Sequence, residues 1–309
     1  MTEEALQSEA VRQPQASGGP RVWWLAIRPK TLPAAIASVI VGSVLAWYDG
    51  GFNAGPALAA LLIAMLLQIG SNLANDVYDD ERGADTAERL GPTRVTQAGL
   101  LSRAQVKAGM KTVLAVAFVL GLYLTWVRGP LVLVFGVAAI TAAVAYTGGP
   151  WPLGYHGLGE VFVFLFFGVL AVVGTYWVQT GDTTTAAWLM SVPVGLLITA
   201  ILVVNNLRDI EQDRAAGKHT IAVRIGARAT RVEYLLCIVG AYATVALGVA
   251  LTWLPLAALA AWLSAPLAAF TSRIVFTAEG RPLNRALALT GQTTLVFAVL
   301  FALGVLLAG

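Results

Sequence analysis

The sequence contains one polar pattern twice. Asparagine and two aspartates recur at intervals of four residues, at Asn72, Asp76 and Asp80 and again at Asn205, Asp209 and Asp213. Positions four apart lie on one face of a helix, so each stretch aligns its side-chain oxygens on one side of a helix end. Two such ends facing each other would gather four to five carboxylates in one small volume. The repeat therefore predicts a site rather than two isolated groups of solvated acids.

Carboxylates held close together near apolar surroundings need a compensating cation. Mg²⁺ prefers oxygen ligands and commonly joins one or two carboxylates to the phosphates of a substrate. The pattern therefore predicts a magnesium and diphosphate site with Asp76, Asp80, Asp209 and Asp213 as ligands. Asp79 stands beside Asp80, and spacing alone does not decide which of the two holds the metal. Acids that serve ion transport usually lie near the middle of broken helices rather than at helix ends.

Basic, amide and aromatic residues near these motifs complete the candidate site. The predicted substrate-binding residues, besides Asn72 and Asn205, are Arg28, Lys30, Gln68, Arg94, Arg208, Arg214 and Lys218. Gln68 precedes Asn72 by one turn and so shares its helix face. Tyr146 follows an apolar run at the same side of the membrane, where its ring can stabilise a developing carbocation. Lys30 and Arg94 are each suited to hold a carboxylate or a diphosphate.

The composition is that of a membrane protein. Of 309 residues, 58% are hydrophobic and only 12% are charged, against about 25% charged residues in soluble proteins. The net charge of +3 is small, and its basic residues are spread over loops, so nucleic acid is not an expected partner. The first 20 residues are polar and predict a disordered tail, followed by one membrane domain over residues 21–309.

Apolar runs of membrane-spanning length occur nine times and predict an all-α integral membrane fold. The predicted spans cover residues 31–48, 55–75, 104–126, 129–147, 158–179, 187–207, 233–253, 255–276 and 286–308. Every Lys and Arg except Arg128 falls in or beside the N-terminal tail or the connections 2–3, 6–7 and 8–9. The positive-inside rule makes that side cytoplasmic. The N-terminus is then cytoplasmic and the C-terminus outside, in a cell membrane.

Several of these segments together resemble the UbiA superfamily of intramembrane aromatic prenyltransferases. Within it the similarity is strongest to the branch that prenylates 1,4-dihydroxy-2-naphthoate in menaquinone biosynthesis. The segments that carry the resemblance are RPKTLP (28–33), SNLANDVYD (71–79), RLGPTRVTQAG (89–99), GLGE (157–160) and NNLRDIEQDRAAGKHTIAVRIG (205–226). The branch has its second acid at the position of Asp79, whereas the broader superfamily spacing points to Asp80. Both are present here.

The resemblance implies nine helices around a central cavity that the cytoplasmic 2–3 and 6–7 connections cap. It also implies two Mg²⁺ ions on a polyprenyl diphosphate, 1,4-dihydroxy-2-naphthoate as the acceptor, and release of CO₂. Other acceptors, such as 4-hydroxybenzoate, a chlorophyllide, haem or homogentisate, are the alternatives within the family. A cation-coupled transporter or a non-catalytic scaffold is the alternative from another class. Isoprenoid length and oligomeric state do not follow from the sequence.

Overall fold

A computed structural model describes residues 18–84 and 89–309, and every regular element in these ranges is a helix. The predicted tail lies mostly outside the described residues, and Pro20 already begins a helix. The α-helices are α2 (Pro20–Ile27), α3 (Leu32–Tyr48), α4 (Ala54–Glu81), α5 (Arg103–Arg128), α6 (Leu131–Ala145), α7 (Gly159–Val163), α8 (Ala171–Thr180), α9 (Thr185–Arg208), α10 (Ile210–Ala215), α11 (Ile221–Ala250), α12 (Ala265–Thr277) and α13 (Leu283–Leu306). The 3₁₀-helices are η1 (Pro29–Thr31), η2 (Leu153–His156) and η4 (Leu256–Ser264), and η3 (Phe164–Leu170) is a π-helix.

Eight helical segments of the described chain are long and apolar enough to cross a bilayer. They overlap eight of the nine predicted spans, so the protein is an all-helical, multi-pass membrane protein. The predicted span 129–147 corresponds to α6, which is apolar but has only 15 residues. It is shorter than predicted because Pro130 precedes its first turn and Tyr146 ends it.

Two predicted boundaries were wrong, and polar partners explain both. Helix α4 continues to Glu81 instead of ending near residue 75, because its acidic side chains find cationic and backbone donors. Helix α11 begins at Ile221 instead of residue 233. Thr220 caps it by accepting a hydrogen bond from the backbone of Val223 at 3.3 Å. At Gly226 a φ of 78° interrupts it, a conformation that glycine adopts without steric cost.

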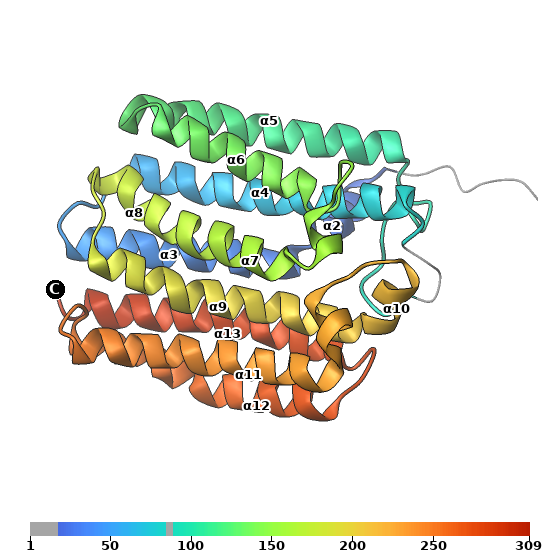
Figure 1. The fold of residues 1–309 in the computed structure, drawn as a ribbon. Helices are drawn as coiled ribbons and strands as arrows, with labels where there is room; N and C mark the ends of the chain where they lie inside the picture. The colour runs from blue at the N-terminus through green and yellow to red at the C-terminus, as the bar shows by residue number, and fades with distance from the viewer. Residues whose placement is uncertain (1–17, 85–88) are drawn as a thin grey trace, which may run out of the picture.

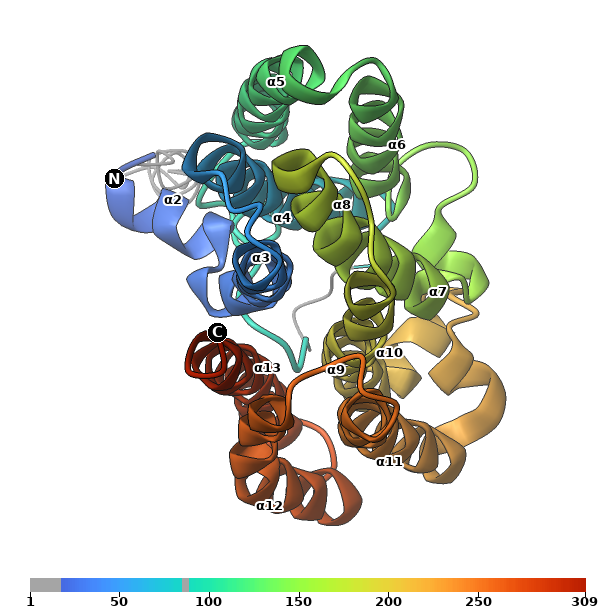
Figure 2. The same cartoon turned by 90° about the vertical axis from the view of Figure 1, so that its left-hand side faces the viewer.

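The helices run side by side, and the long polar connections gather at one end of the molecule (Figure 1). This charged end holds α2, α10 and the connection after α4, whereas the C-terminus lies at the opposite end. Seen along the helices, α3, α9 and α13 are neighbours, and α5 and α12 lie at opposite edges (Figure 2). The arrangement places both acidic motifs at the same end.

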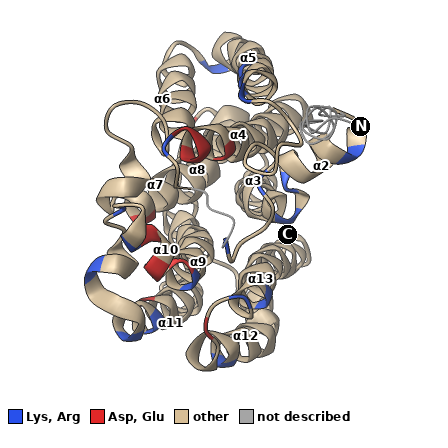
Figure 3. Ribbon diagram, turned by 90° about the vertical axis from the view of Figure 1, so that its right-hand side faces the viewer, with Lys and Arg blue, Asp and Glu red and all other residues tan. Residues whose placement is uncertain are grey.

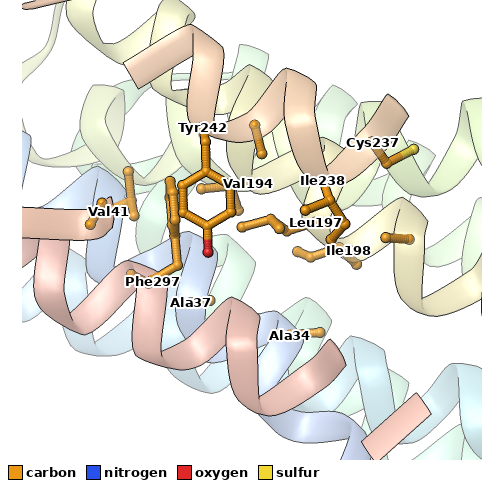
Figure 4. Packing of buried hydrophobic residues seen from close by; sticks show 14 of the residues in the cluster. Ala34, Ala37, Val41, Val194, Leu197, Ile198, Cys237, Ile238, Tyr242 and Phe297 are labelled. Carbon is orange, nitrogen blue, oxygen red and sulfur yellow. The ribbon is translucent and has the colours of Figure 1, made fainter. Parts of the chain in front are cut away.

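The largest hydrophobic core joins α3, α9, α11 and α13 (Figure 4). Tyr242 of α11 meets Phe297 of α13 edge to face, with ring centroids 5.6 Å apart. Small residues on α3, such as Ala34 and Ala37, let the neighbouring helices approach closely. This packing holds α9, which carries the start of the second motif, against α3, α11 and α13.

A glycine pair fixes the contact between η3 and α9. A Cβ atom on Gly168 would lie only 2.6 Å from the Cα atom of Gly195. Since real Cβ atoms do not approach backbone so closely, Gly168 has no room for a side chain, and a Cβ atom on Gly195 would lie 2.8 Å from the ring of Phe164. Small residues allow membrane helices to pack this tightly. The contact sets the position of η3, whose other face lines an apolar cavity.

Candidate active site

The last turns of α4 carry the first acidic motif, and Asp76 ties the following connection to it. Its buried carboxylate accepts hydrogen bonds from the backbone of Val95 at 3.1 Å and of Thr96 at 2.9 Å. Arg28 donates to the same carboxylate at 3.4 Å. Asp76 therefore holds the 2–3 connection over the end of α4 and joins it to the junction of α2 and η1.

Asp79 and Asp80 point to different surroundings. The side chain of Asp79 is buried, and one carboxylate oxygen accepts from Arg94 at 3.0 Å. Its other oxygen accepts from the Tyr155 hydroxyl at 2.8 Å and from Lys218 at 3.3 Å. Asp80 instead accepts from Arg103 of α5 at 2.6 Å. Asp79 thus faces the second motif, and Asp80 faces away from it.

The second motif, from Asn205 to Asp213, is helical except for a short break between α9 and α10. Helix α9 ends at Arg208, and Asp209 adopts φ −101° and ψ 12° before α10 begins. The helical hydrogen bond from the backbone N–H of Asp213 to the Asp209 carbonyl persists at 2.8 Å. This places the Asp213 carboxylate 3.6 Å from the Lys218 ammonium, which also contacts Asp79. Lys218 therefore lies between the two motifs and brings them together.

Burial raises the pKa of the Asp213 carboxyl to about 6. Lys218 opposes this effect, whereas the negative charges of Asp209 and Asp79 add to it. A carboxyl group with a raised pKa is one whose charged form lacks sufficient compensation. The raised pKa of Asp213 therefore reflects mainly the loss of hydration on burial, which the Lys218 ammonium only partly offsets.

Arg208 connects three segments of the chain. Its guanidinium donates to both carboxylate oxygens of Asp209, and to Asn205 at 2.9 Å. It also donates to the Asn284 side chain of α13 at 2.7 Å. Asn284 in turn donates to the Leu90 carbonyl at 2.8 Å. The 2–3 and 6–7 connections are thus joined through α13 as well as through Lys218.

Four other predicted residues lie around this cluster in different ways. Gln68 and Asn72 both donate to the Thr31 hydroxyl, at 3.2 Å and 2.9 Å, so they position the start of α3. Lys30 is exposed on η1. Arg214 is exposed and pairs with Glu211 at 2.9 Å. Neither Lys30 nor Arg214 contacts the aspartates within the described part of the chain.

Tyr146 joins the charged end to an apolar cavity of about 210 Å³. The cavity lies among α3, α4, α5, α6, η3 and α8, and its lining is almost wholly hydrophobic. Tyr146 and Ser71 line it on the turns nearest the acidic motifs. The arrangement can therefore hold a molecule with an anionic head and a long apolar tail.

The sequence reasoning did not identify Tyr155 or Arg82. Tyr155 binds Asp79, and the Lys218 ammonium lies 4.7 Å from the centroid of its ring. Arg82 lies 5.4 Å from the same ring and donates to the carbonyls of Thr147 and Gly149. The backbone N–H of His219 donates to the Tyr155 carbonyl at 2.8 Å. The glycine- and proline-rich segment 148–157 was the only signal that this connection has a fixed conformation.

Charge distribution at this end agrees with a site for a divalent cation and an anion (Figure 3). Arginine and lysine separate the carboxylates, so within residues 18–84 and 89–309 no three metal-binding side chains converge on one point. The sequence predicted four to five carboxylates in one small volume. In the structure, cationic side chains lie between them instead. Among the described residues, the Thr96 hydroxyl is buried without a hydrogen-bond partner, next to the backbone N–H that donates to Asp76. Hydroxyl and carboxylate oxygens are the kind of ligand that Mg²⁺ prefers.

The comparisons with known proteins agree with this geometry. Residues 35–287 match the UbiA prenyltransferase family. The chain is 40% identical to a 1,4-dihydroxy-2-naphthoate octaprenyltransferase of Haemophilus influenzae, over 93% of this chain and 96% of the relative. It is 39% identical to the Mycobacterium tuberculosis enzyme of the same name, over 91% and 95%.

Solved structures share the fold at low sequence identity. A UbiA homologue from Aeropyrum pernix has a TM-score of 0.69 at 18% identity, over 89% of this chain and 97% of that one. A UbiA homologue from Archaeoglobus fulgidus, bound to GPP and Mg²⁺, has a TM-score of 0.65 at 15% identity, over 92% and 99%. The fold, the paired acidic motifs and the extent of the matches lead to one conclusion: this chain is a member of the UbiA prenyltransferase family.

Proposed function

We propose that this protein transfers a polyprenyl group from an isoprenoid diphosphate to 1,4-dihydroxy-2-naphthoate, with release of diphosphate and CO₂, as a step of menaquinone biosynthesis. The observation that carries the proposal is the position of Lys218 between Asp79 and Asp213, at the end of the molecule where Tyr146 and Ser71 line an apolar cavity. Relatives at 39–40% identity bear the name of this activity. The two lines of support are independent, because one is geometric and the other is sequence similarity.

Asp76, Asp79, Asp209 and Asp213 are the residues that would hold Mg²⁺. Asp79 is preferred over Asp80 because it is buried and faces Asp213, whereas Asp80 pairs with Arg103. When bound, Mg²⁺ (two ions, as the family resemblance implies) would supply charge neutralisation for the leaving diphosphate. Arg28, Arg94, Arg208 and Lys218 now pair with the aspartates. They transfer part of this pairing to the diphosphate when it binds.

The apolar cavity receives the first isoprene units of the donor. It begins at Tyr146 and Ser71 and continues among hydrophobic side chains toward Leu124 and Val178. Its walls exclude water from the carbon that becomes cationic as the C–O bond breaks. The Tyr146 ring at its polar end is placed to stabilise that carbon through its π face. The rest of a long tail extends into the bilayer.

Bond making and bond breaking balance at the acceptor. The electron pair of the broken C–O bond leaves with the diphosphate. The naphthalenediol carbon that bears the carboxylate then forms the new C–C bond. Loss of CO₂ returns an electron pair to the ring and restores its aromatic character, so no proton needs to be removed from that carbon. Lys30, exposed beside the start of α3, or Arg94 holds the carboxylate before it leaves.

The charged end faces the cytoplasm in this proposal. When α6 is counted together with the eight longer spans, the chain crosses the cell membrane nine times. The N-terminal side of α2 is then cytoplasmic, and the C-terminus lies on the outer side. Support comes from the positive charges, which gather at the end that carries the acidic motifs (Figure 3). A short α6 is compatible with a crossing, because neighbouring side chains and local thinning of the bilayer compensate for limited length.

The direct test is an assay of purified full-length protein with octaprenyl diphosphate and 1,4-dihydroxy-2-naphthoate labelled at the carboxylate. We expect prenylated naphthoquinol by mass spectrometry, equimolar labelled CO₂, and loss of both when EDTA removes Mg²⁺. Product with 4-hydroxybenzoate but none with the naphthoate would overturn the acceptor assignment. Absence of any prenylated product would overturn the transferase assignment, provided that the preparation is monodisperse and its thermal unfolding shows that it is folded.

A further inference from the structure

A second groove lies on the outer surface between α11 and α12, away from the candidate active site. Its volume is about 560 Å³, and its lining is apolar apart from Ser272 and Arg273 at one end. Leu235, Val239 and Phe276 stand at its rim and are exposed. In a multi-pass membrane protein such a surface contacts lipid, so the groove opens to the bilayer.

Small residues on α12 create this groove. Ala265, Ala268, Ala269 and Ser272 follow one another at helical spacing on the face that lines it, so α12 presents little side-chain volume toward α11. Tyr242 and Trp262 close the deep end, where their rings meet edge to face at 5.6 Å. The groove follows α11 from Leu235 to Ala243, a length of about 12 Å. This shape fits the upper part of an acyl chain.

The charged side chain at the mouth of the groove is Arg273. It lies one turn before the end of α12, at the charged end of the molecule, and it is exposed. Within the described residues no hydrogen bond or ion pair engages its guanidinium, although its backbone carbonyl accepts from the Thr277 hydroxyl. The neighbouring Arg231 differs, because it donates to the carbonyls of Val275 and Ala278 and pairs with Glu279 at 3.5 Å. Arg273 is therefore available to an anion at the depth of the lipid headgroups.

We propose that the α11–α12 groove binds one anionic phospholipid, with an acyl chain between the helices and the phosphate on Arg273. Basic side chains at the ends of membrane helices recognise anionic headgroups, and an arginine offers several donors to a phosphate. A quinone or an uncharged isoprenoid would fill the apolar part equally well but gives no anionic partner to Arg273. Charge complementarity therefore favours the phospholipid. The site lies outside the proposed reaction and does not depend on it.

Native mass spectrometry of the full-length protein tests the proposal, with phosphatidylglycerol and phosphatidylcholine as probes. We expect one phosphatidylglycerol to be retained in preference to phosphatidylcholine. Arg273→Gln should weaken that retention about tenfold, the effect of losing a charge-assisted hydrogen bond. Ala269→Phe should weaken it by filling the groove from its exposed side. Matched controls are Arg281→Gln and Ala115→Phe, which change an exposed arginine and an exposed alanine outside the groove lining.

Three outcomes would overturn the proposal. The first is equal retention of both lipids by the unaltered protein. The second is unchanged retention of phosphatidylglycerol in both single variants, Arg273→Gln and Ala269→Phe. The third is a retained molecule whose mass is that of an isoprenoid quinone rather than a phospholipid. Prenyl transfer measured in lipid-free detergent is expected to be unaffected by either variant, which separates this test from that of the proposed function.

Discussion

At the scale of single residues, the site depends on which of two adjacent aspartates points inward. Consecutive residues on a helix differ in direction by about 100°, so Asp79 and Asp80 cannot share one environment. Asp79 receives three donors from three separate connections of the chain, namely Arg94, Tyr155 and Lys218. Asp80 accepts a hydrogen bond from Arg103 of the adjacent helix. The tertiary contacts therefore distinguish two residues that are equivalent by type.

This difference predicts unequal effects of two isosteric substitutions. Asp79→Asn should lower kcat/KM for prenyl transfer by about two orders of magnitude or more, as expected when a group that stabilises developing charge is removed. Asp80→Asn should change it by less than about fivefold, because exposed ion pairs contribute little. Steady-state rates at saturating Mg²⁺ provide the measurement, and unchanged thermal unfolding of both variants is the control. Equal losses in the two variants would contradict the assignment.

Tyr155 is expected to act by positioning Asp79 and Lys218. Tyr155→Phe removes the hydroxyl that donates to Asp79 and keeps the ring beside the Lys218 ammonium. A hydrogen bond to a charged group contributes about 1.5–3 kcal/mol, so kcat/KM should fall about tenfold or more. Tyr155→Ala loses both contacts, so its kcat/KM should fall further. Titration of activity against Mg²⁺ is the measurement that separates the roles, since a purely structural tyrosine would leave the apparent Mg²⁺ affinity unchanged in Tyr155→Phe.

At the scale of elements, the contact between η3 and α9 shapes the apolar cavity. Phe166, Phe167 and Leu170 of η3 line the cavity, while Gly168 on the same element meets Gly195 of α9. π-Helical turns often occur at functional sites because the extra residue redirects side chains. Close packing on one face of η3 therefore fixes the orientation of the aromatic wall on the other.

Gly168→Ala tests this packing. The added methyl group would meet the backbone of Gly195 at 2.6 Å, and such overpacking costs about 1–3 kcal/mol. The melting temperature in detergent should fall. The matched control is Gly174→Ala, where the nearest atom to the new Cβ is 3.9 Å away. That variant should melt at an equal or higher temperature, because alanine favours a helix more than glycine does. Similar melting temperatures for both variants would exclude a tight η3–α9 contact.

At the scale of the whole molecule, function depends on joining a charged end to an apolar interior. The cavity collects side chains from α3, α4, α5, α6, η3 and α8, so no single helix defines it. Opposite the charged end, Arg128 donates to the Val178 carbonyl at 2.9 Å and thereby caps α8. The single basic residue predicted on the outer side thus has a structural partner and does not disturb the separation of charge.

Narrowing the cavity should discriminate between donors of different length. Gly136 of α6 lines the cavity, and a Cβ atom there would meet nothing within 4 Å, so Gly136→Leu fills space without a backbone clash. KM should rise several-fold for octaprenyl diphosphate and change little for dimethylallyl diphosphate, whose single isoprene unit remains near Tyr146. Ala115→Leu, on the exposed face of α5, is the control. Equal effects on both donors would place the tail elsewhere.

The sequence alone determined the helical membrane fold class, the two acidic motifs and their location at one common end of the molecule. These features depend on local properties, namely apolar segments of spanning length, the distribution of basic residues and i, i+4 spacing. It also indicated the family, because long motifs such as 205–226 retain their order. Helix ends were less well predicted, as for α4 and α11, since partners distant in sequence keep polar turns helical.

Only the tertiary structure decided how the motifs meet. Lys218 lies between Asp79 and Asp213, Tyr155 approaches from the 4–5 connection, and Asn284 from α13. The contacts of Asp79 with Tyr155 and Lys218, and of Arg208 with Asn284, join residues 76 to 139 positions apart in the chain, and spacing along one helix carries no information about them. The choice between Asp79 and Asp80 has the same origin. Helix periodicity sets the direction of each side chain relative to its own axis, but only packing determines what lies in that direction.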